Sequence, residues 1–271
     1  MGGMTAAFST SFDQSDDAAL ARELVKHAGT LALRMRDEGL ETTEKTSVSD
    51  VVTDADRAAE NFVAEALGKL RPADGILGEE GAAKASTSGR TWVVDPVDGT
   101  YNFASGSDYF CSAIALVEGE PANPERILTS AVYRPALETL WQAADGQATC
   151  NGRRLGPLPA AGLDQLGVAT YLHPASMQIE PVRAAWTAAV EGAATIRMLG
   201  AGSIDLSTVA SGGIGAWLQH TVADWDWLPG RALVEAAGGR TIKVSAGGVE
   251  WCVAGNQRVI EDIATRLSHH A

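Results

Sequence analysis

Apolar residues recur at helical spacing in the first patterned part of the chain. Between Leu20 and Met35 they return every three to four positions, which predicts an amphipathic helix that packs on a core. Ser15 or Asp16 is placed to cap its first turn. Residues 1–15 show no such period and are rich in small and polar residues, so we expect a loose terminus there.

A second helical pattern begins after the segment DVVTDAD at 50–56 and continues to Leu70. Thr53 or Asp54 is placed to cap it. The polar stretch at 42–50 lies between the two helical patterns and has no apolar period, which predicts a loop.

Short apolar runs separated by turn residues follow in the middle of the chain. They predict short strands at 76–77 and 92–94, followed by an antiparallel sheet with strands at 109–117, 127–133, 139–143 and 148–150. From about Gly162 strands alternate with helices, which predicts an α/β half. Its expected strands are 168–171, 195–199, 215–219, 241–244 and 251–254, and its expected helices lie at 181–190, after Gly200, at 226–237 and at 256–267. We therefore expect an α+β half at 16–160 and an α/β half at 161–271 that form one unit.

Composition agrees with a globular protein that can bury a core. The chain has 271 residues, 45% of them hydrophobic, which allows one large domain or two tightly joined halves. No apolar run reaches the length of a membrane span, and the first residues lack a basic segment followed by an apolar one. A formal charge of -13 argues against a nucleic-acid surface. We expect neither a membrane nor a nucleic acid as partner.

The cysteines indicate a reducing compartment. Cys111, Cys150 and Cys252 are odd in number, widely spaced and without a CxxC pair. Neither a disulfide framework nor a zinc site is predicted by that pattern. We expect buried thiols in a cytoplasmic protein.

The segment TWVVDPVDGTYNF at 91–103 brings two carboxylates and a turn into thirteen residues. The apolar run before Asp95 predicts a strand, and Pro96 has no amide hydrogen, so we expect the strand to stop there. Asp98 follows across a turn that Gly99 permits, and both carboxylates can face one cavity. An Asp–Gly pair after a strand is also common in ordinary turns, so this spacing alone leaves a structural role open.

Two carboxylates held that close repel each other unless one is protonated or cations lie between them. Ligands that are all oxygen favour a hard ion such as Mg2+ over zinc. The amides of Gly99, Thr100 and Tyr101 stand at a predicted helix start, where a phosphate oxygen can be held. The segment therefore predicts a metal and phosphate site.

Acids at the ends of other elements repeat this arrangement. Glu79 and Glu80 follow the short strand at 76–77. Asp226 is placed to cap the helix at 226–237, with Pro229 in the first turn, and this capping role would be enough to explain it. Asp56 could simply complement a helix dipole. The amides from Gly200 to Ser203 offer a second cradle for an oxygen-rich ligand.

Three blocks of the sequence resemble the signature segments of the inositol monophosphatase family. They are GEE at 78–80, WVVDPVDGTYNF at 92–103 and WDWLPGRALVEAAGG at 225–239, and the segments at 50–56, 150–155 and 200–206 also match. The resemblance implies a layered αβαβα fold, commonly a homodimer, that hydrolyses phosphate monoesters. It implies two to three Mg2+ ions per active site, inhibition by lithium, and attack by a water molecule that the metal activates.

The resemblance also assigns roles to single residues. It implies metal ligation by the carboxylates of Glu79, Asp95, Asp98 and Asp226 and by the backbone carbonyl of Val97. Asp56 corresponds to an acid that helps to hold a third metal ion and its water. Thr100 corresponds to the hydroxyl that orients the attacking water together with Glu79, and the amides of Gly99 and Thr100 correspond to phosphate contacts.

The expected substrate is a small phosphorylated alcohol, with binding residues at Asp98, Gly99, Thr100, Ala201, Gly202, Gln219 and Asp226. Where members that cleave inositol phosphate typically have a glutamate, this chain has Gln219, followed by His220. An amide still exchanges hydrogen bonds with hydroxyls but cannot pair with a cation. We rank myo-inositol phosphate first and histidinol phosphate second, ahead of sugar bisphosphates and phosphoadenosine phosphate. The alternative from another class is a non-catalytic binding protein associated with transcription.

Overall fold

The structure is a computed structural model that describes residues 16–39, 42–47 and 50–270. The expected loose terminus at 1–15 lies outside these residues. The described helices are α2 (Asp17–Glu38), α3 (Asp54–Leu70), α4 (Thr100–Ala104), α5 (Glu180–Val190), α6 (Gly202–Ala210), α7 (Asp224–Ala236) and α8 (Gln257–Ser268), with short 3-10 turns η1 (Pro135–Leu137), η2 (Leu163–Gln165) and η3 (Ser176–Gln178).

The described strands form a hairpin and two larger sheets. The hairpin pairs β1 (Thr42–Ser47) with β2 (Asp50–Thr53). The eight-stranded sheet contains β3 (Gly75–Gly78), β4 (Ala83–Lys84), β5 (Arg90–Asp98), β6 (Cys111–Glu118), β7 (Arg126–Arg134), β8 (Thr139–Ala144), β9 (Gln147–Cys150) and β10 (Arg153–Arg154), in the order β10-β9-β8-β7-β6-β5-β3-β4. The five-stranded sheet contains β11 (Gly167–Tyr171), β12 (Thr195–Arg197), β13 (Ala216–His220), β14 (Arg240–Ala246) and β15 (Val249–Gly255), in the order β12-β11-β13-β15-β14.

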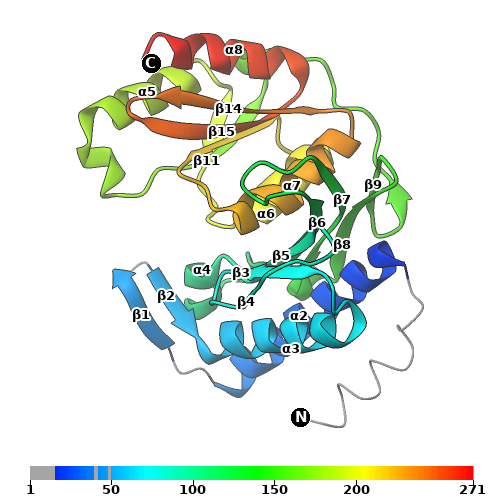
Figure 1. Cartoon of the computed structure of the whole chain (residues 1–271). Helices are drawn as coiled ribbons and strands as arrows, with labels where there is room; N and C mark the ends of the chain where they lie inside the picture. The colour runs from blue at the N-terminus through cyan, green and yellow to red at the C-terminus, as the bar shows by residue number, and fades with distance from the viewer. Residues whose placement is uncertain (1–15, 40–41, 48–49, 271) are drawn as a thin grey trace.

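The elements stack in five layers, and the alternation of side chains along the strands shows why (Figure 1). Trp92 and Val94 of β5 pack in a cluster with α2 and α3. Val93 points the other way, into a cluster with α6 and α7 that also contains Trp217 of the five-stranded sheet. The far face of that sheet packs on α5 and α8. Because both faces of each sheet are covered by helices, the order of layers is αβαβα, as expected.

The helices in the outer layer of the N-terminal half follow the predicted patterns with small shifts. Asp16 is the N-cap of α2, and its side chain accepts a hydrogen bond from the amide of Ala19 at 2.6 Å. Thr53 caps α3. The buried face of α3 includes Leu70, where the predicted pattern ends, and also two acids, Asp56 and Glu60, whose oxygens accept backbone amides.

The prediction of a loop at 42–50 was wrong for the residues that the structure describes. Residues 42–47 form β1, which pairs antiparallel with β2. The threonines of this stretch are β-branched and favour extended backbone, so the hairpin forms although the sequence has no apolar alternation. Strand β2 then leads directly into α3.

Strand β5 does not stop at Pro96, as the sequence predicted, but continues to Asp98 through a β-bulge. Asp95 lies opposite Ala113 of β6, and Asp98 lies opposite Cys111. Three steps along β5 therefore match two steps along β6, so one extra residue is inserted. The bulge tolerates the missing amide hydrogen of Pro96, because the regular pairing with β6 is interrupted between Asp95 and Asp98.

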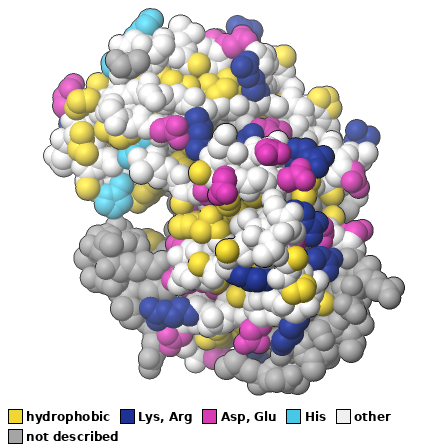
Figure 2. Space-filling view, in the orientation of Figure 1, with side chains coloured by type: hydrophobic (Ala, Val, Ile, Leu, Met, Phe, Trp, Pro, Cys, Tyr) yellow, Lys and Arg dark blue, Asp and Glu magenta, His cyan; other side chains and the backbone are white. Residues whose placement is uncertain are grey.

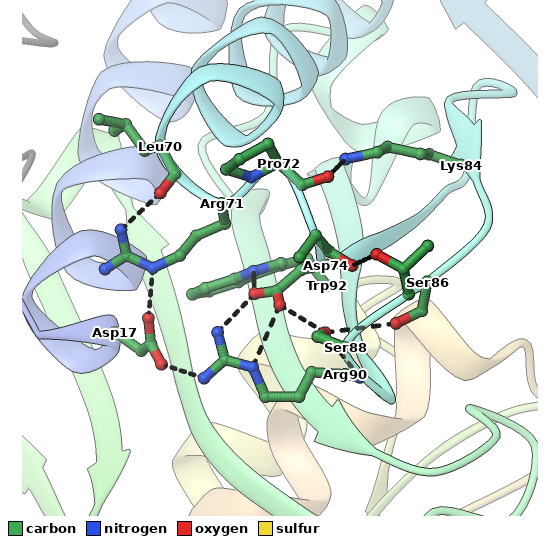
Figure 3. A network of polar contacts seen from close by, with 12 residues as sticks. Asp17, Leu70, Arg71, Pro72, Asp74, Lys84, Ser86, Ser88, Arg90 and Trp92 are labelled. Atoms are coloured by element: carbon green, nitrogen blue, oxygen red, sulfur yellow. Dashed lines mark hydrogen bonds and ion pairs between the residues drawn. The ribbon is translucent and has the colours of Figure 1, made fainter.

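A network of ion pairs ties the outer helices to the eight-stranded sheet (Figure 3). Asp74 is almost fully buried and accepts four hydrogen bonds: from Ser88 at 2.7 Å, from Arg90 at 3.1 and 2.7 Å, and from the Trp92 indole at 3.0 Å. Arg90 also pairs with Asp17 at 2.7 Å, at the first residue of α2. Burial by itself raises the pKa of Asp74, but these hydrogen bonds outweigh it and hold the pKa below its usual value.

Asp74→Asn is expected to lower the free energy of unfolding by about 2–4 kcal/mol, because an amide nitrogen would face the donors of Arg90, Ser88 and Trp92. The folded pKa of Asp74 is depressed, so its stabilisation is present above the unfolded pKa and is lost as pH falls through the folded pKa. Urea titrations from pH 3 to 7 should therefore show a flatter pH dependence in the variant.

The matched control for Asp74 is Glu118→Gln, which removes an exposed partner of Arg126. Its expected effect is below about 0.5 kcal/mol, because exposed ion pairs contribute little. Equal stability losses in the two variants would contradict the structural role of the Asp74 network.

Within the described part of the chain, no helix combines the length and the apolar character needed to cross a membrane. Cys111, Cys150 and Cys252 are all free thiols. Cys111 and Cys252 are buried as expected, while Cys150 is partly exposed.

Candidate metal and phosphate site

Asp95 lies near the end of β5 on the face that meets the middle helical layer. It stands two residues after Val93, which packs against α6 and α7, and side chains two apart on a strand share a face. Its Oδ1 accepts the amide of Val97 at 3.1 Å, whereas its buried Oδ2 has no hydrogen-bond partner among the described residues. Burial, and next the charge of Glu79, raise the pKa of Asp95 well above its usual range.

Asp98 reaches the same face because of the bulge. Without an inserted residue, a spacing of three would point the two carboxylates to opposite faces of the sheet. Opposite Cys111, Asp98 turns toward the start of α6 and accepts the amides of Gly202, at 3.2 Å, and Ser203. Burial raises the pKa of Asp98, although these amide hydrogen bonds act in the other direction.

Asp226 comes from α7 and completes a group of three carboxylates. One oxygen each of Asp95, Asp98 and Asp226 lies within 4.8 Å of the others. The prediction that Asp226 caps its helix was wrong, because α7 already begins at Asp224 and Ala223 is its N-cap. Pro229 therefore lies beyond the first turn. Asp226 is the third residue of α7, and a side chain at this position can turn toward β5 instead of toward the end of its own helix.

Glu79 follows the end of β3, the neighbour of β5 in the sheet. Its amide donates to the carbonyl of Val94 at 3.2 Å, which ties the turn after β3 to the strand that carries Asp95. Among neighbouring charges, that of Glu79 contributes most to the raised pKa of Asp95, ahead of Asp98 and Asp226. The structure thus places Glu79 near Asp95, beside the group formed by Asp95, Asp98 and Asp226.

Asp56 and Thr100 are joined beside this group. Asp56 is fully buried, and its Oδ2 accepts the amide of Thr53 at 2.9 Å and the Thr53 hydroxyl, which completes a capping box. The Thr100 hydroxyl lies 3.1 Å from Oδ1 of Asp56 and 3.0 Å from the carbonyl of Val97. A hydroxyl has one hydrogen, so it can donate to only one of these oxygens at a time.

Gly99 has the left-handed backbone that the sequence predicted, with φ of 90°. A Cβ here would lie 3.0 Å from the Cβ of Ala201 and 3.0 Å from the carbonyl of Tyr109. The turn that leads from β5 into α4 therefore packs directly on the segment before α6. Glycine is required both for the backbone angle and for this close approach.

The remaining predicted binding residues lie at the edges of this arrangement. Ala201 is buried against Gly99, and the amide of Gly202 is already donated to Asp98, so this part of the expected second cradle holds a side chain of the protein itself. Gln219 is partly exposed on β13 and lies beside Tyr171 of the parallel strand β11.

Two acids of the site were missed by sequence reasoning. Glu60 is buried on α3, and its signal was a spacing of four residues after Asp56. Asp205 is buried on α6 and accepts the Tyr109 hydroxyl at 2.6 Å, and burial raises its pKa to about 7. Nothing in the sequence indicated that contact, because it joins residues 96 positions apart.

The group of acids fits a hard divalent cation. A buried carboxylate oxygen without a donor, at Asp95, is costly unless a cation or a proton neutralises it. The donors are oxygens only, the set that Mg2+ prefers. Protonation is the alternative at low pH, and the raised pKa values of Asp95 and Asp98 describe the protein without cations.

Comparisons with known proteins agree with this picture. The family model described as inositol monophosphatase family matches residues 13–270. A histidinol-phosphatase from Mycobacterium tuberculosis is 32% identical and covers 93% of this chain and 98% of its own length. An inositol-1-monophosphatase from Rhizobium meliloti is 35% identical, covering 74% of each chain. Nus factor SuhB from Pseudomonas aeruginosa is 32% identical, covering 93% of this chain and 95% of its own.

A solved structure shows the same architecture. The extragenic suppressor protein SuhB from Bartonella henselae superposes with a TM-score of 0.81 at 27% identity, covering 92% of this chain and 97% of its own. The fold and the acidic site thus define a metal-dependent phosphomonoesterase. The chain belongs to the inositol monophosphatase family.

Proposed function

We propose that this protein releases inorganic phosphate from a small phosphorylated alcohol with the help of Mg2+. The observation that carries the proposal is the group of Asp95, Asp98 and Asp226, in which one oxygen of each residue lies within 4.8 Å of the others and the buried Oδ2 of Asp95 accepts no hydrogen bond from the described residues. Three acids so placed are costly for a fold that has no cation to bind.

Two to three Mg2+ ions would be held by the carboxylates of Glu79, Asp95, Asp98 and Asp226 and by the carbonyl of Val97. When bound, such ions neutralise the charge of a transferring phosphoryl group and make a water molecule a stronger nucleophile. Asp98 is held in place by the amides of Gly202 and Ser203, so its orientation does not depend on the substrate.

Asp56 and Thr100 are the groups that we expect to handle the proton of the attacking water. The Thr100 hydroxyl can donate to Asp56, which frees the oxygen of Thr100 to accept a hydrogen bond from water. Glu79 would accept a second hydrogen bond from the same water. The amides of Gly99 and Thr100, after the left-handed turn, are proposed to contact the phosphate.

Phosphate release with and without a chelator tests this proposal. The purified protein should release phosphate from myo-inositol phosphate in Mg2+, lose that activity in EDTA, and regain it when Mg2+ is returned. Activity that is unchanged by EDTA would contradict the metal-dependent reaction. Equally low activity with every phosphomonoester would favour a binding role instead.

For the substrate we propose myo-inositol phosphate first and histidinol phosphate second. Gln219 supports this order, because its amide lies at the end of β13 and can exchange hydrogen bonds with hydroxyls, while it offers no charge to an amine. The names of relatives include both activities. Sugar bisphosphates and phosphoadenosine phosphate rank behind them.

A panel of phosphomonoesters compared by kcat/KM at fixed Mg2+, for the wild type and for Gln219→Glu, decides the substrate. We expect Gln219→Glu to improve hydrolysis of inositol phosphate several-fold, because a carboxylate accepts more strongly from hydroxyls. A flat response across the panel would mean that Gln219 does not contact the alcohol.

A binding role in transcription is the second candidate, supported by a relative named Nus factor SuhB. Among the described residues on the face in Figure 2, Lys and Arg are interspersed with Asp and Glu and form no continuous basic area, which supports the enzyme over the binding role.

We also propose a homodimer. It is supported by Ile196 on the edge strand β12 and Met198 just after it, whose apolar side chains are exposed. A cytoplasmic location is supported by the free thiols, and sensitivity to lithium follows from the family resemblance.

A further inference from the structure

Glu60 is a buried acid on α3 that no part of the proposed reaction uses. It lies one helical turn after Asp56, and only 4% of it is exposed. Its Oε2 accepts the amide of Glu80 at 2.8 Å, and its Oε1 accepts the amide of Ala82 at 2.7 Å. Both carboxylate oxygens are therefore used to hold the backbone of one turn.

That turn connects β3 with β4 and carries Glu79. The amide of Gly78 donates to the carbonyl of Ala82 at 2.8 Å, which closes the turn on itself. Gly78 is needed for the contact with α3, because a Cβ there would lie 2.2 Å from Oε2 of Glu60. Glu60 thus contacts Gly78 at the end of β3 and accepts hydrogen bonds from the turn at Glu80 and Ala82, which follow Glu79 in the chain.

We propose that Glu60 is a positioning residue that fixes Glu79 for metal binding. The inference rests on the proposed function, since it assigns Glu79 to the metal site. Glu79 stands between Gly78 and Glu80, so its backbone cannot shift without breaking a hydrogen bond to Glu60 or to Val94. A ligand held in this way loses less freedom when it binds an ion, and groups that orient metal ligands set the affinity of the site.

The chemistry of the contact requires a carboxylate. Glu60 faces two backbone N–H donors, and a carboxylate accepts at both oxygens. A glutamine of the same shape accepts at one oxygen and points its NH2 group at the other donor. Glu60→Gln therefore releases one side of the turn while it keeps the volume of the side chain.

Mn2+ binding to the full-length protein without substrate measures this role directly. Mn2+ takes the same oxygen ligands as Mg2+, and its free form is counted by electron paramagnetic resonance. Glu60→Gln is expected to weaken Mn2+ binding roughly 10- to 100-fold, the usual effect of removing a group that orients a ligand. Saturating metal should return kcat toward the wild-type value.

The matched control is Glu65→Gln on the same helix. Glu65 is exposed and lies 3.9 Å from Lys69, so this variant makes the same change of charge without touching the turn. Its Mn2+ affinity should equal that of the wild type. Urea unfolding in EDTA establishes that each variant is folded before the metal is added.

Gly78→Ala provides a second, independent variant, because its methyl group would push the Glu60 carboxylate off the turn. It should weaken Mn2+ binding as well, and the double variant with Glu60→Gln should lose less than the product of the two single effects. Where Glu60→Gln does not fold, Gly78→Ala carries the test alone.

The outcomes separate this inference from the proposed function. A wild-type protein that binds no Mn2+ contradicts the metal-dependent phosphatase and this inference together. A wild type that binds Mn2+, with unchanged affinity in folded Glu60→Gln or Gly78→Ala, contradicts the positioning role alone. Weaker binding in both variants and not in Glu65→Gln supports it.

Discussion

Asp95→Asn is expected to abolish phosphate release and, at the same time, to make the metal-free protein more stable. Loss of a carboxylate that would hold the ion neutralising the phosphoryl charge removes about 4 kcal/mol of transition-state stabilisation, roughly a 1,000-fold fall in kcat. The gain in stability has a separate cause. Asparagine keeps an oxygen that accepts the amide hydrogen of Val97. Its neutral NH2 group replaces Oδ2, a buried oxygen that accepts no hydrogen bond within the described part of the chain.

The sign of the pH dependence follows from the raised pKa of Asp95. An acid whose folded pKa lies above its unfolded pKa contributes stability that is fully present below the unfolded pKa and is lost as pH rises through the folded pKa. Near neutral pH the metal-free wild type therefore has a lower free energy of unfolding than the variant. We expect a difference of about 1–3 kcal/mol there, the usual cost of an unsatisfied buried polar group, and convergence of the two proteins in acid.

Urea unfolding in EDTA between pH 4 and 8, with phosphate release measured in parallel, checks both parts. Asp54→Asn is the control, because Asp54 is an exposed acid of α3 that pairs with Arg57 at 3.6 Å. It should leave activity intact and change stability by less than about 0.5 kcal/mol. An Asp95→Asn protein that is less stable than the wild type at pH 7 would show that Asp95 supports the fold rather than the reaction.

Asp98→Asn is expected to abolish turnover to a similar degree but to lower stability instead of raising it. Asp98 accepts the amides of Gly202 and Ser203 with different oxygens. In either orientation of the asparagine amide, its NH2 group meets one backbone N–H and leaves that donor unpaired. The expected cost is about 1–3 kcal/mol, which is small enough to leave the protein folded.

The pair of neighbouring variants gives a sharp comparison. Both should be inactive in Mg2+, while their unfolding free energies in EDTA should move in opposite directions from the wild type. Near-normal turnover in Asp98→Asn would remove Asp98 from the metal site. Equal stability changes in the two variants would contradict the hydrogen bonds that distinguish them.

Several features of this protein follow from its sequence because they depend on neighbours along the chain. The period of apolar residues predicted α2 and α3, and the resemblance of three sequence blocks to a known family implied the layered fold. The left-handed turn at Gly99 follows from the residue itself. A site for a hard cation could be predicted before any contact was known, because Asp95, Asp98 and Glu79 all offer carboxylate oxygens.

Tertiary structure alone decided how these acids meet. The bulge in β5 turns Asp98 to the side of Asp95, and it depends on pairing with β6, which the residues around Pro96 do not specify. Asp226 looked like a helix cap, and Glu60 looked like any helical acid. Their roles come from contacts with β5 and with the turn after β3, and such contacts between distant segments are fixed by packing rather than by local propensity.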